Sequence, residues 1–183
     1  MRALQTVTPD AVESFENLPA CKDVLKRRHL FAVDLRDFLH ESQWQASFKF
    51  AFVRNPWSRL VSWYLMCVGK PRNQFQHYVK ANTENFDDFL RLTSGIAEKT
   101  TFNQVDYVCD EQGKLILDFV GRFETLPADF GYVCRQLDVN LELPHLNKGK
   151  QGDYRSYYNA EARNLVAKRF ERDIRTFQYS FDD

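Results

Sequence analysis

Residues 52–64 read Phe-Val-Arg-Asn-Pro-Trp-Ser-Arg-Leu-Val-Ser-Trp-Tyr and join a predicted strand to a predicted helix. The strand covers residues 48–53, which alternate in polarity at first and then become continuously apolar, as in a strand buried on both faces. Pro56 ends the strand, because the residue before a proline avoids helical backbone angles. Residues 57–68 then resume a helical spacing of apolar side chains. Helices interleaved with a buried strand predict an α/β architecture.

The corner between this strand and this helix is a candidate binding site, because ligands of α/β sheets bind outside the carboxyl ends of strands. Arg54 stands at that end, and a guanidinium can form two parallel hydrogen bonds to a phosphate. The following helix offers backbone N–H groups and its positive end. Ser62 lies about two turns into it and can add a hydroxyl donor. The alternative is structural, with Arg54 paired to an acid and Ser62 filling a tightly packed position.

The composition is that of one globular domain, and we expect a single domain over residues 1–183. Hydrophobic residues make up 44% and charged residues 27%, which excludes a disordered chain. Lys and Arg number 25, as do Asp and Glu, so bulk charge favours neither nucleic acid nor an anionic membrane as a partner. No apolar run reaches the roughly 20 residues of a membrane span. Residues 1–9 lack the apolar core of a secretory signal.

Charge is balanced overall but segregated along the chain. Residues 84–129 contain ten acids and four bases, whereas residues 148–175 contain eight bases and four acids. Solvated faces are the ordinary interpretation, and a basic pocket for a small polyanion is the sharper one. The four cysteines are widely spaced and form no Cys/His cluster, so no metal site is expected. Cys67 and Cys134 lie in apolar sequence and are interpreted as buried free thiols.

The remaining elements follow from periodicity and from capping residues. Helices are predicted over residues 10–28, 33–39, 86–92, 125–137 (capped by Thr125) and after Asn159. The last helix carries one apolar stripe, formed by Leu165, Val166, Phe170, Ile174 and Phe177. Residues 105–120 predict a β-hairpin that turns at Gly113, and residues 143–158 predict an irregular loop.

Residues 54–64 resemble the 3′-phosphate-binding signature of sulfotransferases that use 3′-phosphoadenosine 5′-phosphosulfate (PAPS), and most closely the carbohydrate-type sulfotransferase family 2 domain. Three more segments, in the expected order, carry the same resemblance: residues 118–126, 143–147 and 173–181. The resemblance covers about residues 29 to 181. It implies a P-loop-type sulfotransferase fold, with a parallel sheet flanked by helices. It also implies transfer of a sulfuryl group from PAPS to a hydroxyl acceptor, most simply a carbohydrate.

By this resemblance Arg54 and Ser62 hold the ribose 3′-phosphate. Residues 147–154, Asn-Lys-Gly-Lys-Gln-Gly-Asp-Tyr, are similar to the Arg-Lys-Gly-x-x-Gly-Asp-Trp loop that closes over the same phosphate in cytosolic sulfotransferases. Lys148 and Gly149 match that loop, whereas its Arg is replaced by Asn. Without the family, a flexible surface crossover is the simpler interpretation. Arg122 is expected on the nucleotide side, with a structural ion pair as an equal alternative.

His29 is the candidate catalytic base. The segment His29-Leu-Phe-Ala-Val-Asp-Leu resembles the His-Leu-Pro segment of the cytosolic enzymes, in which the His removes the proton of the acceptor hydroxyl. An imidazole with a pKa near 6.5 suits that task. The alternative is a surface or capping His beside Arg27 and Arg28.

The family also has a 5′-phosphosulfate loop, whose backbone N–H groups and Lys hold the phosphosulfate. We find no such loop, and residues 1–28 contain no glycine. We therefore expect an N-terminally incomplete fold that binds PAPS poorly. The alternative function is a catalytically inactive PAP- or PAPS-binding or interaction domain of the same fold.

A P-loop kinase relative is disfavoured, because Gly-x-x-x-x-Gly-Lys-[Ser/Thr] is absent from the chain. The expected partners are a small-molecule nucleotide and a hydroxyl acceptor, whose identity one sequence leaves open. With no anchor visible, a bacterial cytoplasmic location is expected rather than the Golgi lumen.

Overall fold

The computed structural model describes residues 31–94, 103–143 and 152–183, so the helix predicted over residues 10–28 lies outside it. The described residues are mostly helical, with a two-stranded parallel sheet. They belong to two compact units, each built from two separate segments of the chain. The first unit contains Met1–Val53 and Asp106–Lys148, and the second contains Arg54–Val105 and Gly149–Asp183. No helix within the described ranges is long and apolar enough to cross a membrane.

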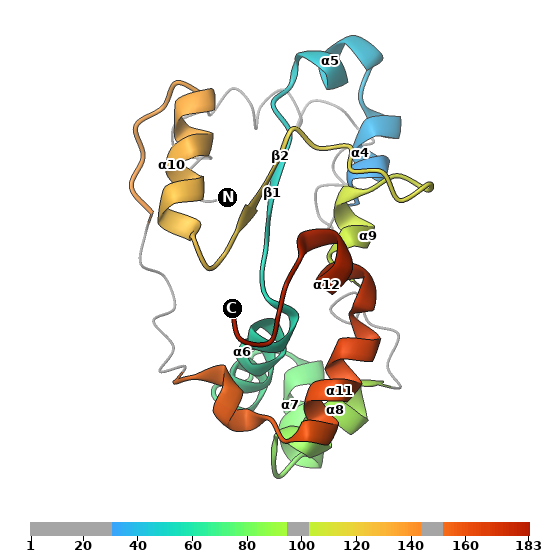
Figure 1. The fold of residues 1–183 in the computed structure, drawn as a ribbon, viewed down its shortest axis with the longest axis vertical. Helices are drawn as coiled ribbons and strands as arrows, with labels where there is room; N and C mark the ends of the chain where they lie inside the picture. The colour runs from blue at the N-terminus through green and yellow to red at the C-terminus, as the bar shows by residue number, and fades with distance from the viewer. Residues whose placement is uncertain (1–30, 95–102, 144–151) are drawn as a thin grey trace. The chain divides into compact units, whose positions relative to one another are not determined.

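The sheet of the first unit consists of β1 (Phe50–Val53) and β2 (Phe119–Arg122), which Figure 1 shows side by side. Lys49 fixes their register, because its N–H donates to Asp118 Oδ2 (2.7 Å) and its carbonyl accepts from the Asp118 N–H (2.9 Å). These hydrogen bonds, the one from the Lys49 backbone first, lower the pKa of the Asp118 carboxyl. The strand predicted over residues 48–53 is therefore confirmed, two residues shorter, and its pairing is parallel as predicted.

Helix α10 (Leu126–Gln136) packs against β2 in the first unit (Figure 1), with the ring centroids of Tyr132 and Phe119 4.6 Å apart. Gly121 lies on the same strand, directly opposite Phe52. A Cβ at Gly121 would come within 2.6 Å of the Phe52 ring, closer than side chains approach. A larger residue at this position would therefore have to displace the Phe52 ring.

Thr125 stands at the N-cap of α10 as predicted, but its side chain does not cap the helix. Its hydroxyl instead donates to Asp129 Oδ2 at 2.8 Å. The same carboxylate oxygen accepts from the N–H of Arg122 at 2.6 Å. The first turn of α10 is thus tied to the end of β2 by one acid.

The hairpin predicted over residues 105–120 is wrong. Its first half forms a single helical turn, α9 (Val105–Val108), and one isolated antiparallel bridge links Cys109 to Leu115. The turn is correctly predicted, because Gly113 has a φ of 80°, which glycine adopts without strain. The last two residues of this segment, Phe119 and Val120, pair with β1 instead.

In the described part of the first unit, two further helices precede β1. Helix α4 (Ala32–Phe38) confirms the prediction over residues 33–39 within one residue. Helix α5 (Glu41–Ala46) is not predicted, because Trp44 is its one large apolar side chain and no periodicity shows. It begins with a capping box in which the His40 N–H donates to Gln43 Oε1 at 3.1 Å.

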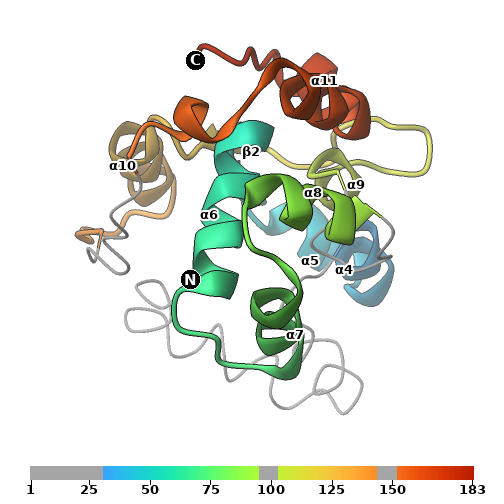
Figure 2. The same cartoon turned by 90° about the horizontal axis from the view of Figure 1, so that it is seen from below.

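Helices build the second unit. Helix α6 (Pro56–Val68) confirms the prediction over residues 57–68, and α8 (Phe86–Ser94) extends that over residues 86–92. Helix α7 (Gln74–Asn82) is not predicted, because polar residues interrupt its apolar spacing. Figure 2 shows α7, α8 and α11 around α6.

Helices α6, α7, α8 and α11 share one hydrophobic core. Its buried members are Trp57, Leu60, Val61, Trp63, Cys67, Val79, Phe86, Phe89, Leu90, Ala162, Val166 and Phe170. Cys67 is a buried free thiol, as is Cys134 in the first unit, which confirms both predictions. Burial raises the pKa of Cys67 to about 11, so the thiol is protonated at neutral pH.

The last predicted helix is two helices, α11 (Ala160–Arg169) and α12 (Glu171–Phe177). Asn159 caps α11 as predicted, with Oδ1 accepting from the Ala162 N–H at 2.8 Å. The chain bends at Phe170, which is fully buried, and this bend breaks the predicted stripe. Leu165 is 40% exposed although Val166 beside it is fully buried, which corrects the place of Leu165 in the stripe.

The connection before α11 is only partly as predicted. Residues 144–151 of the predicted loop lie outside the described residues, whereas Tyr154–Tyr157 forms a short 3-10 helix, η2. Asp153 caps it through Oδ1, which accepts from the Arg155 N–H at 3.0 Å. The Tyr154 and Tyr158 rings then pack on Phe181.

Candidate functional site

Asn55 organises the start of α6. It is almost fully buried, and its Oδ1 accepts from the N–H groups of Trp57 (3.0 Å) and Ser58 (3.3 Å). Its Nδ2 donates to the carbonyl of Ser180 at 2.7 Å. Pro56 has no N–H, and the Asn55 carbonyl accepts from Arg59. The first-turn N–H groups of α6 are thus engaged, so the expectation that they face a ligand is wrong and side chains must serve as donors.

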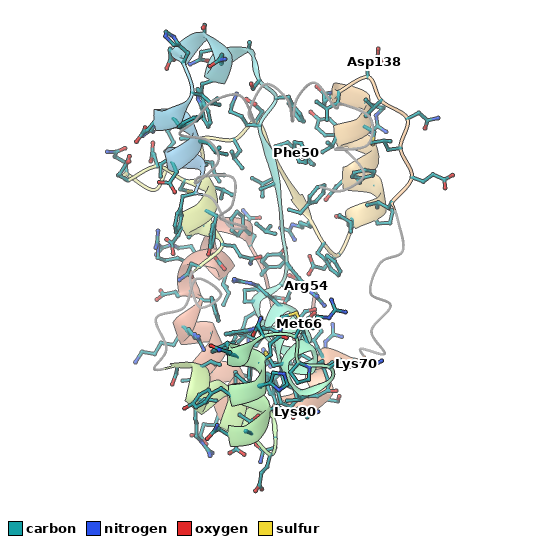
Figure 3. All side chains as sticks on the ribbon, turned by 180° about the vertical axis from the view of Figure 1, so that it is seen from behind. Phe50, Arg54, Met66, Lys70, Lys80 and Asp138 are labelled. Carbon is teal, nitrogen blue, oxygen red and sulfur yellow. The ribbon has the colours of Figure 1, made fainter. Side chains whose placement is uncertain are left out.

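Arg54 precedes this cap, where β1 leads into α6 (Figure 3). Its Nε donates to Ser58 Oγ at 3.0 Å, so the side chain runs along one face of the helix. Residues four apart share a helix face, so Ser62 lies one turn beyond Ser58 on that face. Among the described residues, the half-buried Ser62 hydroxyl has no hydrogen-bond partner. A guanidinium and two hydroxyls therefore follow one another over two turns.

The backbone of Arg54 is held separately from its side chain. Gln104 Oε1 accepts from the Arg54 N–H at 2.9 Å, and Gln104 Nε2 donates to the Arg54 carbonyl at 2.8 Å. The half-buried Arg54 is thus held at its backbone by Gln104 and at its side chain by Ser58, and all three residues belong to the second unit.

The sequence around α6 is positively charged. Residues 42–83 contain six Lys or Arg and no Asp or Glu, although the whole chain has no net charge. The Arg59 guanidinium lies 4.0 Å from the buried Asp173 carboxylate and 5.8 Å from the centre of the Phe170 ring. The N-terminal end of α6 adds the positive pole of the helix dipole. This helix pole favours an anionic ligand, whereas the charge of Arg59 is already paired with Asp173.

Of the other predicted site residues, the structure describes Arg122, which pairs with Val53 in the sheet. Arg122 ends β2 and belongs to the first unit, whereas Arg54 and Ser62 belong to the second. His29, Lys148 and Gly149 lie outside the described residues. Their roles stay predictions. Within the part of the chain that the structure describes, no three His, Cys, Asp or Glu side chains are grouped to hold a metal ion.

Sequence reasoning missed two residues at this corner. Ser58 was within reach, because Arg54, Ser58 and Ser62 follow one another at intervals of four. Gln104 carries no such signal, since it lies 50 residues from Arg54 and outside any periodic pattern.

Residues 11–180, which are most of the chain, match the model of the Sulfotransferase family. The chain belongs to this family. The match confirms the resemblance to the sulfotransferase family 2 domain and begins ahead of His29. Membership of the sulfotransferases implies a P-loop-like fold and suggests transferase activity.

Curated relatives add little about the reaction. The chain is 28% identical over 107 residues to an uncharacterized protein of Archaeoglobus fulgidus, and the aligned region covers 58% of this chain and 81% of that protein. No solved structure matches the chain at a comparable level. Substrate and mechanism must therefore be argued from the site.

Proposed function

We propose that this sulfotransferase moves a sulfuryl group from PAPS to a hydroxyl acceptor, a carbohydrate being the class that its family resemblance favours. Family membership supports the sulfuryl transfer. The observation that carries the site is the row formed by Arg54, Ser58 and Ser62 on α6. A phosphate dianion suits a charge-assisted guanidinium contact that is completed by neutral hydroxyl donors.

Arg54 and Ser62 are the residues that hold the 3′-phosphate, and Ser58 orients the Arg54 side chain. Lys148 and the backbone of Gly149 belong to the loop that closes over the same phosphate, and Arg122 assists on the nucleotide side. PAPS, when bound, supplies the sulfuryl group. His29 accepts the proton of the acceptor hydroxyl, which makes the acceptor oxygen a better nucleophile.

The alternative is a domain of the same fold that binds PAP or PAPS without turnover. The observation in its favour is the absence of any glycine before Gly69, since backbone cradles for phosphates are built with glycine. The two functions share the site at Arg54 and differ in sulfuryl transfer. Binding and transfer therefore have to be measured separately.

Thermal unfolding with and without 3′-phosphoadenosine 5′-phosphate (PAP) tests the site. At 100 times its Kd, a ligand adds about 2.7 kcal/mol to the stability, which gives a measurable rise in Tm. Arg54→Ala should abolish that rise. Arg91→Ala is the control, because the Arg91 side chain is 73% exposed on α8 and forms an ion pair with Asp88 on the same helix. A rise that survives in Arg54→Ala contradicts the assignment.

Transfer is then measured with PAPS and a panel of neutral and acidic oligosaccharides, and PAP release is followed. Sulfated product supports the enzyme. PAP binding that depends on Arg54, without product from any acceptor, supports the alternative.

A further inference from the structure

The side-chain amide of Gln104 pairs with the backbone of Arg54 in the way that a neighbouring strand would. It accepts from the Arg54 N–H at 2.9 Å and donates to the Arg54 carbonyl at 2.8 Å. Both residues belong to the second unit. One glutamine thus satisfies both the N–H and the carbonyl of Arg54, just before α6.

Asp173 holds this amide from its other side. It is fully buried on α12, where Oδ2 accepts from Gln104 Nε2 at 3.2 Å and Oδ1 accepts from the Val105 N–H at 2.8 Å. Both carboxylate oxygens act as acceptors, so they attract the nitrogen of the Gln104 amide. The Gln104 oxygen is consequently left to face the N–H of Arg54, and the orientation of the amide is fixed.

A fixed backbone at Arg54 has a consequence for its side chain. The backbone angles set the direction of the Cα–Cβ bond, and the bond from Nε to Ser58 sets the far end. Catalytic and binding groups lose much of their effect when they shift by about 1 Å. A loose Arg54 backbone would therefore misplace the guanidinium even though the arginine itself is unchanged.

We propose that Gln104, oriented by Asp173, is a positioning residue that places Arg54 for the 3′-phosphate of the nucleotide. This inference rests on the proposed function of Arg54. Gln104 and Asp173 act through Arg54, and neither needs to touch the ligand. Together they connect α12, which lies far along the chain, to the corner between β1 and α6.

A purely structural role is the rival explanation, since the same bonds also tie α12 to the segment before α9. The two roles differ in what they change. If the role is only structural, its loss lowers the stability and weakens the binding of both nucleotides to the same extent. A positioning loss acts on the 3′-phosphate alone, so it lowers the preference for PAP over adenosine 5′-monophosphate, which lacks that group.

The experiment measures the Kd of PAP and of adenosine 5′-monophosphate by calorimetry on the full chain, well below the Tm of each variant. Gln104→Ala should raise the Kd of PAP by about tenfold, as expected for the loss of one well-placed hydrogen bond to a charged group. The Kd of adenosine 5′-monophosphate should stay within about twofold of the wild-type value. The readout is the ratio of the two constants, written as the Kd of adenosine 5′-monophosphate divided by the Kd of PAP, so that a lower ratio means a weaker preference for PAP.

Gln76→Ala is the matched control. Gln76 is 7% exposed, and its Oε1 accepts from the N–H of another arginine, Arg72, at 2.6 Å. The variant therefore removes a buried glutamine that accepts a bond from the backbone of an arginine other than Arg54. It should lower the Tm and leave the ratio unchanged.

A second pair of variants covers the case in which Gln104→Ala does not fold. Gln104→Glu keeps the size of the side chain but places a second acid against Asp173, so it should lower the ratio. Adding Asp173→Asn supplies a side-chain N–H that can donate to the Glu carboxylate. The ratio in the double variant should therefore return part of the way to the wild-type value.

The outcomes separate the two claims. If the wild type does not bind PAP, or binds it equally well without Arg54, the proposed function is wrong and this inference with it. If Arg54→Ala loses PAP whereas the Gln104 variants keep the wild-type ratio, the proposed function stands and Gln104 is structural. An equal loss of both nucleotides also overturns the positioning role.

Discussion

Asp173 is a carboxyl group buried without exposure inside the second unit. Burial raises its pKa above the ordinary range, although the hydrogen bonds from Gln104 and Val105 and the charge of Arg59 act in the opposite direction. The folded protein therefore binds this proton more tightly than the unfolded chain does. Ionisation of Asp173 works against folding.

The pH dependence of stability should reveal this group. Between the ordinary carboxyl pKa and the raised value, the unfolded chain carries fewer protons, so the contribution of Asp173 to the free energy of unfolding falls as the pH rises. Asp173→Asn cannot ionise and lacks this decline. We expect the difference in the free energy of unfolding, wild type minus Asp173→Asn, to decrease from about pH 4 upward and then level off. Urea unfolding at a series of pH values measures it, and a flat or rising difference contradicts the raised pKa.

Single residues at the site were predictable to different degrees. Arg54 and Ser62 stand in a local motif, so the sequence shows their spacing directly. Gln104 acquires its role only when the chain folds back over 50 residues, and a lone glutamine carries no chemical signature of that. Local spacing thus identifies candidate ligand-binding side chains, whereas it does not identify the distant residues that hold them in place.

Helix α6 illustrates how capping depends on burial. Asn55 makes two bonds to the helix and one to Ser180 while almost fully buried. The exposed Asn159 makes one bond to α11 and one, also exposed, to Asp87. Asn55→Ala should lower the free energy of unfolding by about 2–4 kcal/mol, because it loses the cap and leaves buried groups without partners. Asn159→Ala should lower it by about 1 kcal/mol. Chemical denaturation compares them, and equal losses would show that burial does not matter here.

Elements with strong local signals were predicted, and those with partners far along the chain were not. Pro56 and the apolar spacing after it define α6, whereas α5 and α7 are too polar to show a period. The apolar run ending at Val120 was recognised as a strand, but its partner is β1 and not the preceding segment. Alternation predicts a strand and leaves its partner undetermined.

Among the residues that the structure describes, the large hydrophobic core lies within the second unit. The described sheet of the first unit has two strands of four residues each, and so small a sheet is weakly protected by itself. We expect the backbone amides of α6 and α8 to exchange with deuterium more slowly than those of β1 and β2. Hydrogen exchange followed by mass spectrometry tests this order. Equal protection of α6 and β2 would show that the first unit is as stable as the second.

The hydrogen bond between Asn55 and Ser180 joins residues that are 125 positions apart in the sequence. This separation affects how the chain folds while it is being synthesised. At about 5–20 residues per second, a ribosome adds Ser180 roughly 6–25 seconds after Asn55. Until then Trp57 lacks Phe181, the ring that covers it edge-on. We therefore expect the partly synthesised chain to leave the Trp57 ring without this cover for several seconds, and we expect its yield to depend more on chaperones than refolding of the full 183 residues does.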